Sequence, residues 1–310
     1  MSNLPDVQNR LDHRGLAIDR VGVSKFFLPI IFEKQERIAG ISAYVSLPHT
    51  ARGANFSRFV ITAAKYFSNK EINSLVIVEM LRELKKVMKS KDAYVDLEFD
   101  YLIEKESPVT KIKGGYQSYK LGFIGLLKEE EEVTIIRRFE VVAASLCPCS
   151  QELSLLSQLI QDNLKNQKEQ IIHQTIKIEH LDTKEETDLT YLTSQVGKGA
   201  HNQRIYIRVD IEFNNGFDLD TKSTIKGIED CASAGIYPIL KRPDEKWVTE
   251  RAYERPRFVE DIVREVAVYI NKINISNKNI INGYSLRCIA DESIHQHNAI
   301  AYLSKNWKLH

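Results

Sequence analysis

Two cysteines flank a proline near the middle of the chain and are the first residues that could do chemistry. Cys147 and Cys149 stand on either side of Pro148, after an apolar stretch. Because proline fixes the backbone and removes one N–H, the pattern predicts a turn that points one thiol into a site and keeps the other nearby. One sulfur could bind a metal while the other reacts, but two inert thiols in a strand-end turn explain the sequence equally well.

A carboxylate and two imidazoles form a second group. Glu292, His295 and His297 lie close together, after an apolar segment that ends near residue 290. Carboxylates and imidazoles are ligands of divalent ions, although a single histidine is most often a structural residue. In an extended segment the two histidines share one face and Glu292 lies on the other, so the three can meet one ion only if the chain turns.

A third group is spread over two segments. Residues 198–204 contain His201 and Arg204, and residues 241–260 contain Glu245, Glu250 and Glu260. A lone glutamate on a helix usually faces solvent, so only the combination points to function. One thiolate with one or two imidazoles and carboxylates suits zinc, iron or manganese and leaves room for a water molecule, which is a hydrolytic set of ligands.

Composition narrows the class of protein. The chain has 310 residues, and 43 Lys and Arg balance 42 Asp and Glu, for a net charge of +1. This balance provides no long-range field for nucleic acid or an anionic membrane, so we expect neither as a partner. The apolar runs are far shorter than the roughly 20 residues of a membrane span, no signal-peptide pattern is present, and four cysteines are too few for a disulfide scaffold. A cytoplasmic protein is therefore predicted.

Hydrophobic periodicity predicts an α+β fold of antiparallel strands packed by helices. No Walker motif, GxGxxG motif or nucleophile elbow is present, which argues against a doubly wound sheet. The expected strands are residues 20–23, 40–45, 92–103, 117–128, 132–142, 204–213, 283–290 and 299–303. The expected helices are residues 58–67, 74–89, 218–233 and 258–273.

The order of elements in the first half is largely repeated in the second half, although the sequence itself is not. We therefore predict two halves, residues 1–153 and 199–310. Residues 154–198 between them include a run rich in Gln, Lys and Asn at 157–174. This composition is typical of an inserted linker or surface segment, either a surface helix or a loop.

Five segments together resemble the prokaryotic type IB GTP cyclohydrolase family. They occur in the order that the family has them, and they span nearly the whole chain. The segments are residues 4–8 (LPDVQ), 145–150 (SLCPCS), 199–204 (GAHNQR), 240–246 (LKRPDEK) and 292–295 (ESIH). The resemblance implies that the two halves are tandem tunnelling folds, antiparallel sheets packed by helices. It also implies a homotetramer with active sites at the subunit interfaces.

The resemblance assigns a divalent metal ion, manganese, iron or zinc, to the site. The implied metal ligands are Cys147, His201, Glu245, Glu292 and His295, with Glu250 as an alternative to Glu245. Similarity to type IA enzymes adds Glu260, which would accept hydrogen bonds from the guanine of GTP. Its alternative role is to stabilise a helix N-terminus.

The same resemblance implies roles in the reaction itself. Cys147 would hold the metal, and Cys149 would take part in acid–base or nucleophilic chemistry beside it. His297 or His201 would carry protons while the ribose opens and rearranges. Arg58 and Arg204 are the candidates for binding the triphosphate, because the guanidinium fork matches phosphate oxygens.

The implied reaction converts GTP and water to 7,8-dihydroneopterin triphosphate and formate, which feeds the biosynthesis of tetrahydrofolate or of a queuosine-type base. Three alternatives remain open: an enzyme of the same fold that makes a cyclic-phosphate pterin, a nitrile reductase that uses NADPH, and a metal-binding scaffold without activity. The chain departs from the family at Asn55 and Phe56, where many relatives have His-Met, and in the long segment 154–198.

Overall fold

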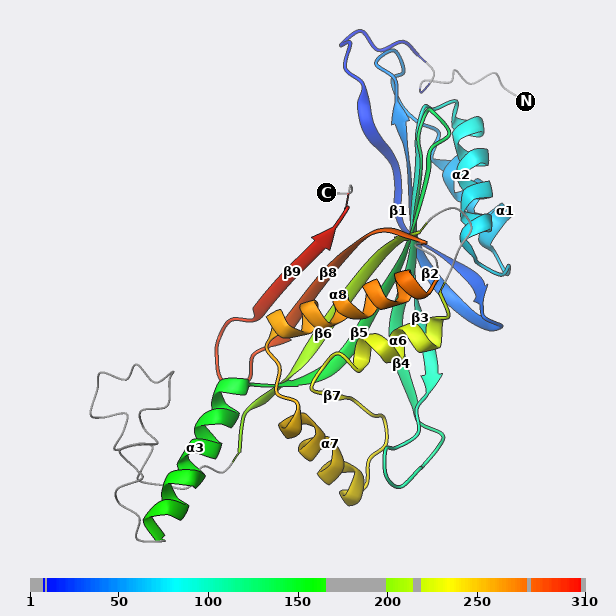
Figure 1. The fold of residues 1–310 in the computed structure, drawn as a ribbon. Helices are drawn as coiled ribbons and strands as arrows, with labels where there is room; N and C mark the ends of the chain where they lie inside the picture. The colour runs from blue at the N-terminus through cyan, green and yellow to red at the C-terminus, as the bar shows by residue number, and fades with distance from the viewer. Residues whose placement is uncertain (1–7, 9, 166–198, 214–218, 278–279, 308–310) are drawn as a thin grey trace.

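A single antiparallel β-sheet extends through the whole molecule (Figure 1). The computed structural model describes residues 8, 10–165, 199–213, 219–277 and 280–307. Within these residues the strand order is β1-β2-β3-β4-β5-β6-β8-β9, and the short β7 pairs with β5. The strands are β1 (Ile18–Phe32), β2 (Gln35–Leu47), β3 (Ala93–Glu104), β4 (Tyr116–Leu127), β5 (Val133–Leu146), β6 (Asn202–Phe213), β7 (Ala234–Gly235), β8 (Ile281–Asp291) and β9 (Ala299–Lys305).

Most of the helices cover one face of this sheet, whereas α3 and α7 extend beyond its strand ends (Figure 1). The helices are α1 (Phe56–Phe67), α2 (Ser74–Met88), α3 (Pro148–Lys165), α6 (Thr221–Glu229), α7 (Arg242–Glu254) and α8 (Val259–Ser276). The pair α1 and α2 packs on strands β1, β3 and β4, whereas α8 packs on β8 and β9 and α6 on β5. No helix in the described ranges is long and apolar enough to cross a membrane.

Alternating burial explains why these segments became strands. In β3 the residues Ala93, Val95, Leu97 and Phe99 are buried, and the residues between them are partly exposed. Such a period of two places one row of side chains against the helices. These rows and the helices share one apolar cluster that extends from β1 to β8. The predicted α+β class, antiparallel strands packed by helices, is confirmed.

Helix α2 also has periodic burial, with the period of a helix. Its buried residues include Ile77, Met80, Leu81 and Leu84, which form one stripe along the helix. The Asn73 side chain caps the N-terminus by accepting a hydrogen bond from the backbone N–H of Val76 at 3.0 Å. These local signals explain why the predicted helix 74–89 nearly coincides with α2.

The face of the sheet without helices carries charge. The Arg138 guanidinium donates to Asp210 at 2.9 and 3.2 Å and to Glu98 at 2.6 Å, and it lies 3.3 Å from Asp96. Arg208 also donates to Glu98, at 3.0 Å. Burial raises the pKa of the Asp96 carboxyl, an effect that Arg138 opposes. These strands therefore have an apolar face and an opposite face built from interlinked ion pairs.

The order β-β-α-α-β-β occurs in β1 to β4 with α1 and α2. It recurs from β5 to β9, with α3, β7 and α7 as additions. The two sets of elements share one continuous sheet through the pairing of β4 with β5. The boundaries at residues 1–153, 154–198 and 199–310 stay a prediction. The predicted segment 154–198 begins within α3, and residues 166–198 lie outside the described residues.

We predict that packing between α2 and β4 is tight enough to be measured by a pair of substitutions. A Cβ atom at Gly125 would lie 2.6 Å from Cγ2 of Ile77 and 2.8 Å from Cδ1 of Leu81. Gly125→Ala should therefore lower the free energy of unfolding by about 1–3 kcal/mol through overpacking. Leu81→Ala should lower it by about 2–5 kcal/mol, because it leaves a cavity.

In the double variant the new methyl group enters the space that Leu81 leaves. The combined loss should then be smaller than the sum of the two single losses, as urea denaturation of the four proteins measures. Strictly additive losses would contradict this packing.

Candidate active site at the ends of strands β5, β6 and β8

Antiparallel pairing brings the first cysteine next to the histidine of the third group. Strand β5 ends at Leu146, which pairs with Asn202 at the start of β6. The backbone N–H of Cys147 then donates to the carbonyl oxygen of His201 at 3.1 Å. Cys147 and His201, far apart in sequence, are therefore neighbours because the sheet ladder continues one step past both strands.

The end of strand β8 reaches the same corner of the sheet. Arg204 of β6 pairs with Asp291, the last residue of β8. Glu292 follows, and its carboxylate accepts a hydrogen bond from the side chain of Gln203 at 3.3 Å. The Ser293 hydroxyl lies 3.4 Å from Nδ1 of His201. One thiol, one imidazole and one carboxylate thus come from three strand ends that meet.

The Cys-Pro-Cys segment turns directly into helix α3, which begins at Pro148. Proline is favoured in the first helical turn because its missing N–H has no partner there. The Ser150 hydroxyl lies between the two segments, since it donates to the carbonyl of Cys147 at 3.2 Å and accepts from the N–H of His201 at 3.3 Å. In place of the predicted turn, the chain enters the first turn of helix α3 directly after the strand.

Both thiols of the segment are free. Cys147 is half-buried and Cys149 is exposed. Desolvation raises the pKa of the Cys149 thiol, and the nearby Cys147 and Glu152 raise it further. In the chain by itself these effects disfavour the thiolate of Cys149.

The two histidines of the second group lie in the exposed loop between β8 and β9. The rings of His295 and His297 stack on each other, with centroids 5.2 Å apart and planes 9° from parallel. The chain bends through residues 293–297, as a shared site with Glu292 requires. Among the residues that the structure describes, no three His, Cys, Asp or Glu side chains converge closely enough to hold a metal ion.

The segment before Glu260 is tied to the same strand end. The backbone N–H of Arg257 donates to the carbonyl of Leu146 at 3.0 Å, and the Ser145 hydroxyl donates to the carbonyl of Arg257 at 2.7 Å. Glu260 lies in the first turn of α8, three residues further along, and is exposed. The structure therefore links the predicted guanine-binding glutamate to the strand that carries Cys147.

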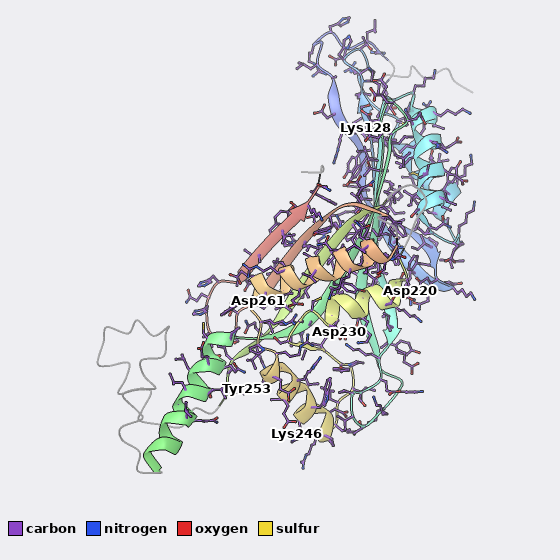
Figure 2. The ribbon with its side chains drawn as sticks, viewed as in Figure 1. Lys128, Asp220, Asp230, Lys246, Tyr253 and Asp261 are labelled. Carbon is purple, nitrogen blue, oxygen red and sulfur yellow. The ribbon has the colours of Figure 1, made fainter. Side chains whose placement is uncertain are left out.

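Helix α7 joins the site at its C-terminal end. The Gln151 side chain of α3 donates to the carbonyl of Tyr253 at 2.8 Å. Lys246 and Tyr253 mark the two ends of α7 in Figure 2. Glu245 is exposed in the first turn of α7, about 12 Å along the helix axis from Tyr253. Within one chain, then, Glu245 lies at the far end of α7 from the contact with α3. Its alternative, Glu250, pairs with Lys246.

The two predicted phosphate-binding arginines lie in different parts of the sheet. Arg204 is exposed on β6, where it pairs with Ala144 and Asp291 beside the strand ends. Arg58 is exposed on α1, where its guanidinium donates to the carbonyl of Val87 at 3.3 Å. One chain therefore gathers Arg204 with the cysteines, His201 and Glu292, but holds Arg58 with the helices of the first half.

A buried carboxylate beside Glu245 was missed by the sequence analysis. Asp244 is fully buried and accepts hydrogen bonds from the N–H groups of Val109, Thr110 and Lys241 at 2.8–2.9 Å and from the Thr110 hydroxyl at 2.5 Å. It thereby fixes the start of α7 to the loop between β3 and β4. An acidic residue directly after Pro243 is a helix N-terminus signal that could have identified its capping role, but not its partners.

We predict that Asp244→Asn lowers Tm at neutral pH, because the amide NH₂ would face groups that are themselves donors. Burial by itself would raise the pKa of Asp244, but the hydrogen bonds from Thr110, Lys241 and Val109 outweigh it and hold the pKa well below its usual range. The stabilisation is therefore present above the unfolded-state pKa of about 3.9 and is lost as the pH falls below it.

The difference in Tm between the unaltered protein and Asp244→Asn should shrink between pH 7 and about pH 3, as thermal melting followed by circular dichroism measures. Glu254→Gln, an exposed change of the same type on α7, is the control and should leave Tm nearly unchanged. A difference that is constant with pH would contradict the role given to the carboxylate.

Comparisons with known proteins agree with this arrangement of motifs. The sequence profile described as type I GTP cyclohydrolase FolE2 matches residues 4–301. The chain is 31% identical to the GTP cyclohydrolase FolE2 of Magnetococcus marinus over 97% of its length and 95% of the relative. It is also 31% identical to that of Kosmotoga olearia, over 98% and 99% of the two chains, and 32% identical to that of Syntrophotalea carbinolica, over 96% and 93%.

Among solved structures, the chain is similar to a uricase from Arthrobacter globiformis, with a TM-score of 0.48, 6% identity and 92% of each chain covered. The uricase is therefore a distant likeness, whereas the sequence matches extend over almost all of this chain. By its sequence from end to end, this chain belongs to the type I GTP cyclohydrolase FolE2 family.

Proposed function

We propose that the protein is a metal-dependent GTP cyclohydrolase of type IB, which converts GTP and water to 7,8-dihydroneopterin triphosphate and formate. This reaction would supply the pterin for folate biosynthesis in the cytoplasm, and it would also feed the biosynthesis of a queuosine-type base. The observation that carries the proposal is that Cys147, His201 and Glu292 stand at three adjoining strand ends, in a chain that matches this family over residues 4–301.

The donors at this corner fit a divalent metal ion. A thiolate sulfur, an imidazole nitrogen and a carboxylate oxygen form a borderline-soft set that suits zinc, iron or manganese. Cys147, His201 and Glu292 would hold the ion, and His295 and Glu245 complete the set. When bound, such an ion lowers the pKa of a water molecule and polarises a carbonyl group, which is the chemistry that ring opening at C8 and formate release require.

The chain's own residues would bind and orient GTP around this corner. Glu260 would accept hydrogen bonds from the ring N–H and the amino group of guanine, since a carboxylate offers two acceptor oxygens. Arg204, beside the strand ends, would bind the triphosphate together with Arg58. Cys149 and His297 would hold or move protons during hydrolysis and rearrangement of the ribose.

Two of the predicted site residues lie away from the strand ends within one chain, and this separation supports a site shared between subunits. Glu245 and Arg58 lie on helices away from the strand ends, so a second copy would supply them in a homotetramer. The two edge strands leave room for such assembly, because β1 and β9 each pair on one side only within the described part of the chain. On β9 the side chains of Ile300 and Tyr302 are 62% and 60% exposed, which is unusual for an edge that faces only water.

The test of the proposal is an anaerobic assay with GTP after removal and return of metal. We expect chelated protein to release no formate, and protein reloaded with manganese, iron or zinc to release formate and a fluorescent oxidised pterin. Cys147→Ser should lose metal and most of its activity because the hydroxyl is a poorer ligand. Formate release that is unaffected by chelation would contradict the proposal.

Cys231→Ser is the matched control for the thiol. Its hydroxyl can make the hydrogen bond to the Gly227 carbonyl that the Cys231 thiol makes at 3.2 Å. This variant should keep its metal and its activity. Mass analysis of the product also separates a triphosphate from a cyclic phosphate, which tests the alternative enzyme of the same fold.

We expect Glu260→Gln to lower kcat/KM for GTP by about 100-fold or more while the metal content stays the same. The amide keeps one acceptor but places an NH₂ donor opposite the donors of guanine. Glu265→Gln on the same helix is the control, because its ion pair with Arg257 is long, at 3.7 Å, and half-exposed. Equal kcat/KM values for the two variants would remove Glu260 from the site.

A further inference from the structure

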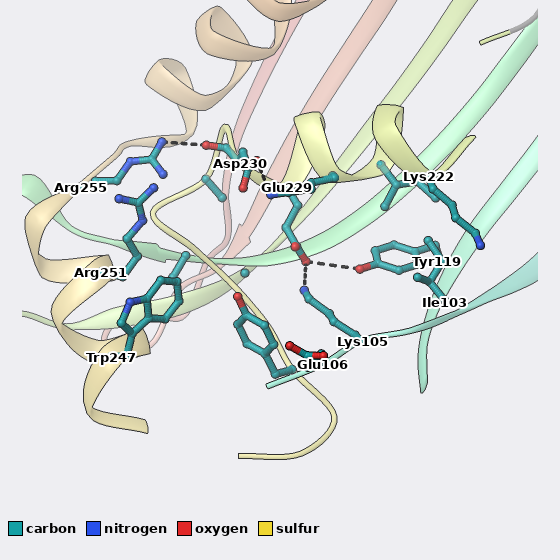
Figure 3. Close-up of a pocket in the computed structure, with 16 residues that line it drawn as sticks. Ile103, Lys105, Glu106, Tyr119, Lys222, Glu229, Asp230, Trp247, Arg251 and Arg255 are labelled. Atoms are coloured by element: carbon teal, nitrogen blue, oxygen red, sulfur yellow. Dashed lines mark hydrogen bonds and ion pairs between the residues drawn. The ribbon is translucent and has the colours of Figure 1, made fainter. Parts of the chain in front are cut away.

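A cavity lies away from the strand ends and is not explained by the proposed reaction. It has a volume of about 690 Å³ and is enclosed by α6, α7 and the adjoining parts of β3 and β4 (Figure 3). None of the predicted metal or substrate residues lines it. Trp247 on its wall is roughly 160° around the axis of α7 from Glu245. The volume is within the range of small-molecule sites.

The floor of the cavity is a polar network that is already satisfied. Lys105 pairs with Glu229 and also donates to the carbonyl of Ile236 at 2.6 Å. The Tyr119 hydroxyl donates to the same carboxylate at 3.4 Å. The Lys105 ammonium also lies 4.3 Å from the centre of the Tyr237 ring. These contacts hold the side chains of the floor in place, and Glu229 neutralises the charge of Lys105.

Each carboxylate that lines the cavity has a cation of its own. Glu229 pairs with Lys105, and Asp230 pairs with Lys226 at 2.7 Å. Glu106 lies 3.6 and 3.9 Å from two lysines outside the cavity, Lys111 and Lys113. Lysines outside α7 therefore form ion pairs with all of these carboxylates.

The cations on the α7 side have no such match. Arg251 has no carboxylate partner among the described residues, and Arg255 donates to the carbonyl of Asp230 at 2.7 Å. Desolvation lowers the pKa of Arg255, and the positive charges of Arg251 and Arg257 lower it further, whereas the charge of Asp230 opposes them. Guanidinium groups that repel each other at a cavity wall are stabilised by an anion between them.

An aromatic surface adjoins these guanidinium groups. Trp247 is 38% exposed, and its ring meets Tyr237 edge to face, with centroids 6.5 Å apart. This contact leaves part of the indole open, and Figure 3 shows Trp247 and Arg251 side by side on α7, across the cavity from Lys105 and Glu229. A planar ring is the ligand group that such a surface stacks best.

We propose that this cavity binds a small molecule in which a planar ring carries an anionic group, either a phosphate or a carboxylate. The anion lies on Arg251 and Arg255, and the ring lies against Trp247. The ligand is thus a nucleoside phosphate or an aromatic carboxylate, held at a site separate from the strand ends that carry Cys147.

Fluorescence of Trp247 tests this binding directly. The chain has two tryptophans, so Trp307→Phe leaves Trp247 as the single reporter. Adenosine monophosphate represents the phosphates, and 4-hydroxybenzoate represents the aromatic carboxylates. We expect saturable quenching by one of the two, which identifies the source of the anion. Adenosine without phosphate and inorganic phosphate without a ring should each bind more weakly than the probe that combines both.

Arg251→Gln in the same background should raise the Kd by about tenfold or more. It should fold normally, since no carboxylate contact is lost, and thermal melting checks this. Arg264→Gln, an exposed arginine on α8, and Glu260→Gln in the proposed GTP site should leave the Kd unchanged. The proposal is overturned by no saturable quenching with either probe at millimolar concentration, by an unchanged Kd in Arg251→Gln, or by adenosine that binds as tightly as its monophosphate.

Discussion

The hydrogen-bond register between β5 and β6 is the constraint on which the candidate site depends. Residues 135–146 pair with residues 202–213 without a shift, and the ladder continues to the bond between Cys147 and His201. A slip of one residue would turn each side chain of a strand to the other face. It would place His201 on the wrong side of the sheet relative to Cys147. The same register buries Phe139 and Val209 opposite each other, so the apolar core holds the site in place.

The two faces of the sheet have different roles. The apolar face binds the helices, and with them the segments that bring Glu260 and α7 toward the strand ends. The opposite face keeps Arg138, Asp210 and Glu98 in ion pairs that are partly withdrawn from water. Charges in such a position are costly unless they are paired and hydrogen-bonded, so this network favours one arrangement of the strands over others.

Two anchors place the helices that the sheet ladder cannot reach. Asp244 fixes the beginning of α7 to residues 109–110, and the contacts of Arg257 with Ser145 and Leu146 fix the beginning of α8 to β5. Both anchors satisfy backbone groups of loops and of a strand end that would otherwise lack a partner. Helix α7 is therefore held at both ends, and its free side faces the cavity that contains Trp247 and Arg251.

The sequence by itself determined most of the elements, because apolar residues with a period of two or of 3.6 can be recognised within a single short segment. Strands β3, β4 and β6 and helices α1, α2 and α8 lie close to their predicted bounds. Helix α7 was not predicted, since only Asp244 and Ala252 of its residues are buried and no apolar stripe marks it. Strand β1 was predicted over only part of its length, because it is an edge strand with many exposed residues.

The sequence also named the chemically active residue types, but only the tertiary structure decided which of them meet. Cys147, His201 and Glu292 are joined by strand pairing over long separations, and no local pattern encodes such a register. The anchoring of α7 by Asp244 likewise depends on a contact with residues 109–110, far away in the chain. Local periodicity fixes which face a residue occupies, whereas the neighbour on that face is fixed by long-range packing and hydrogen bonding.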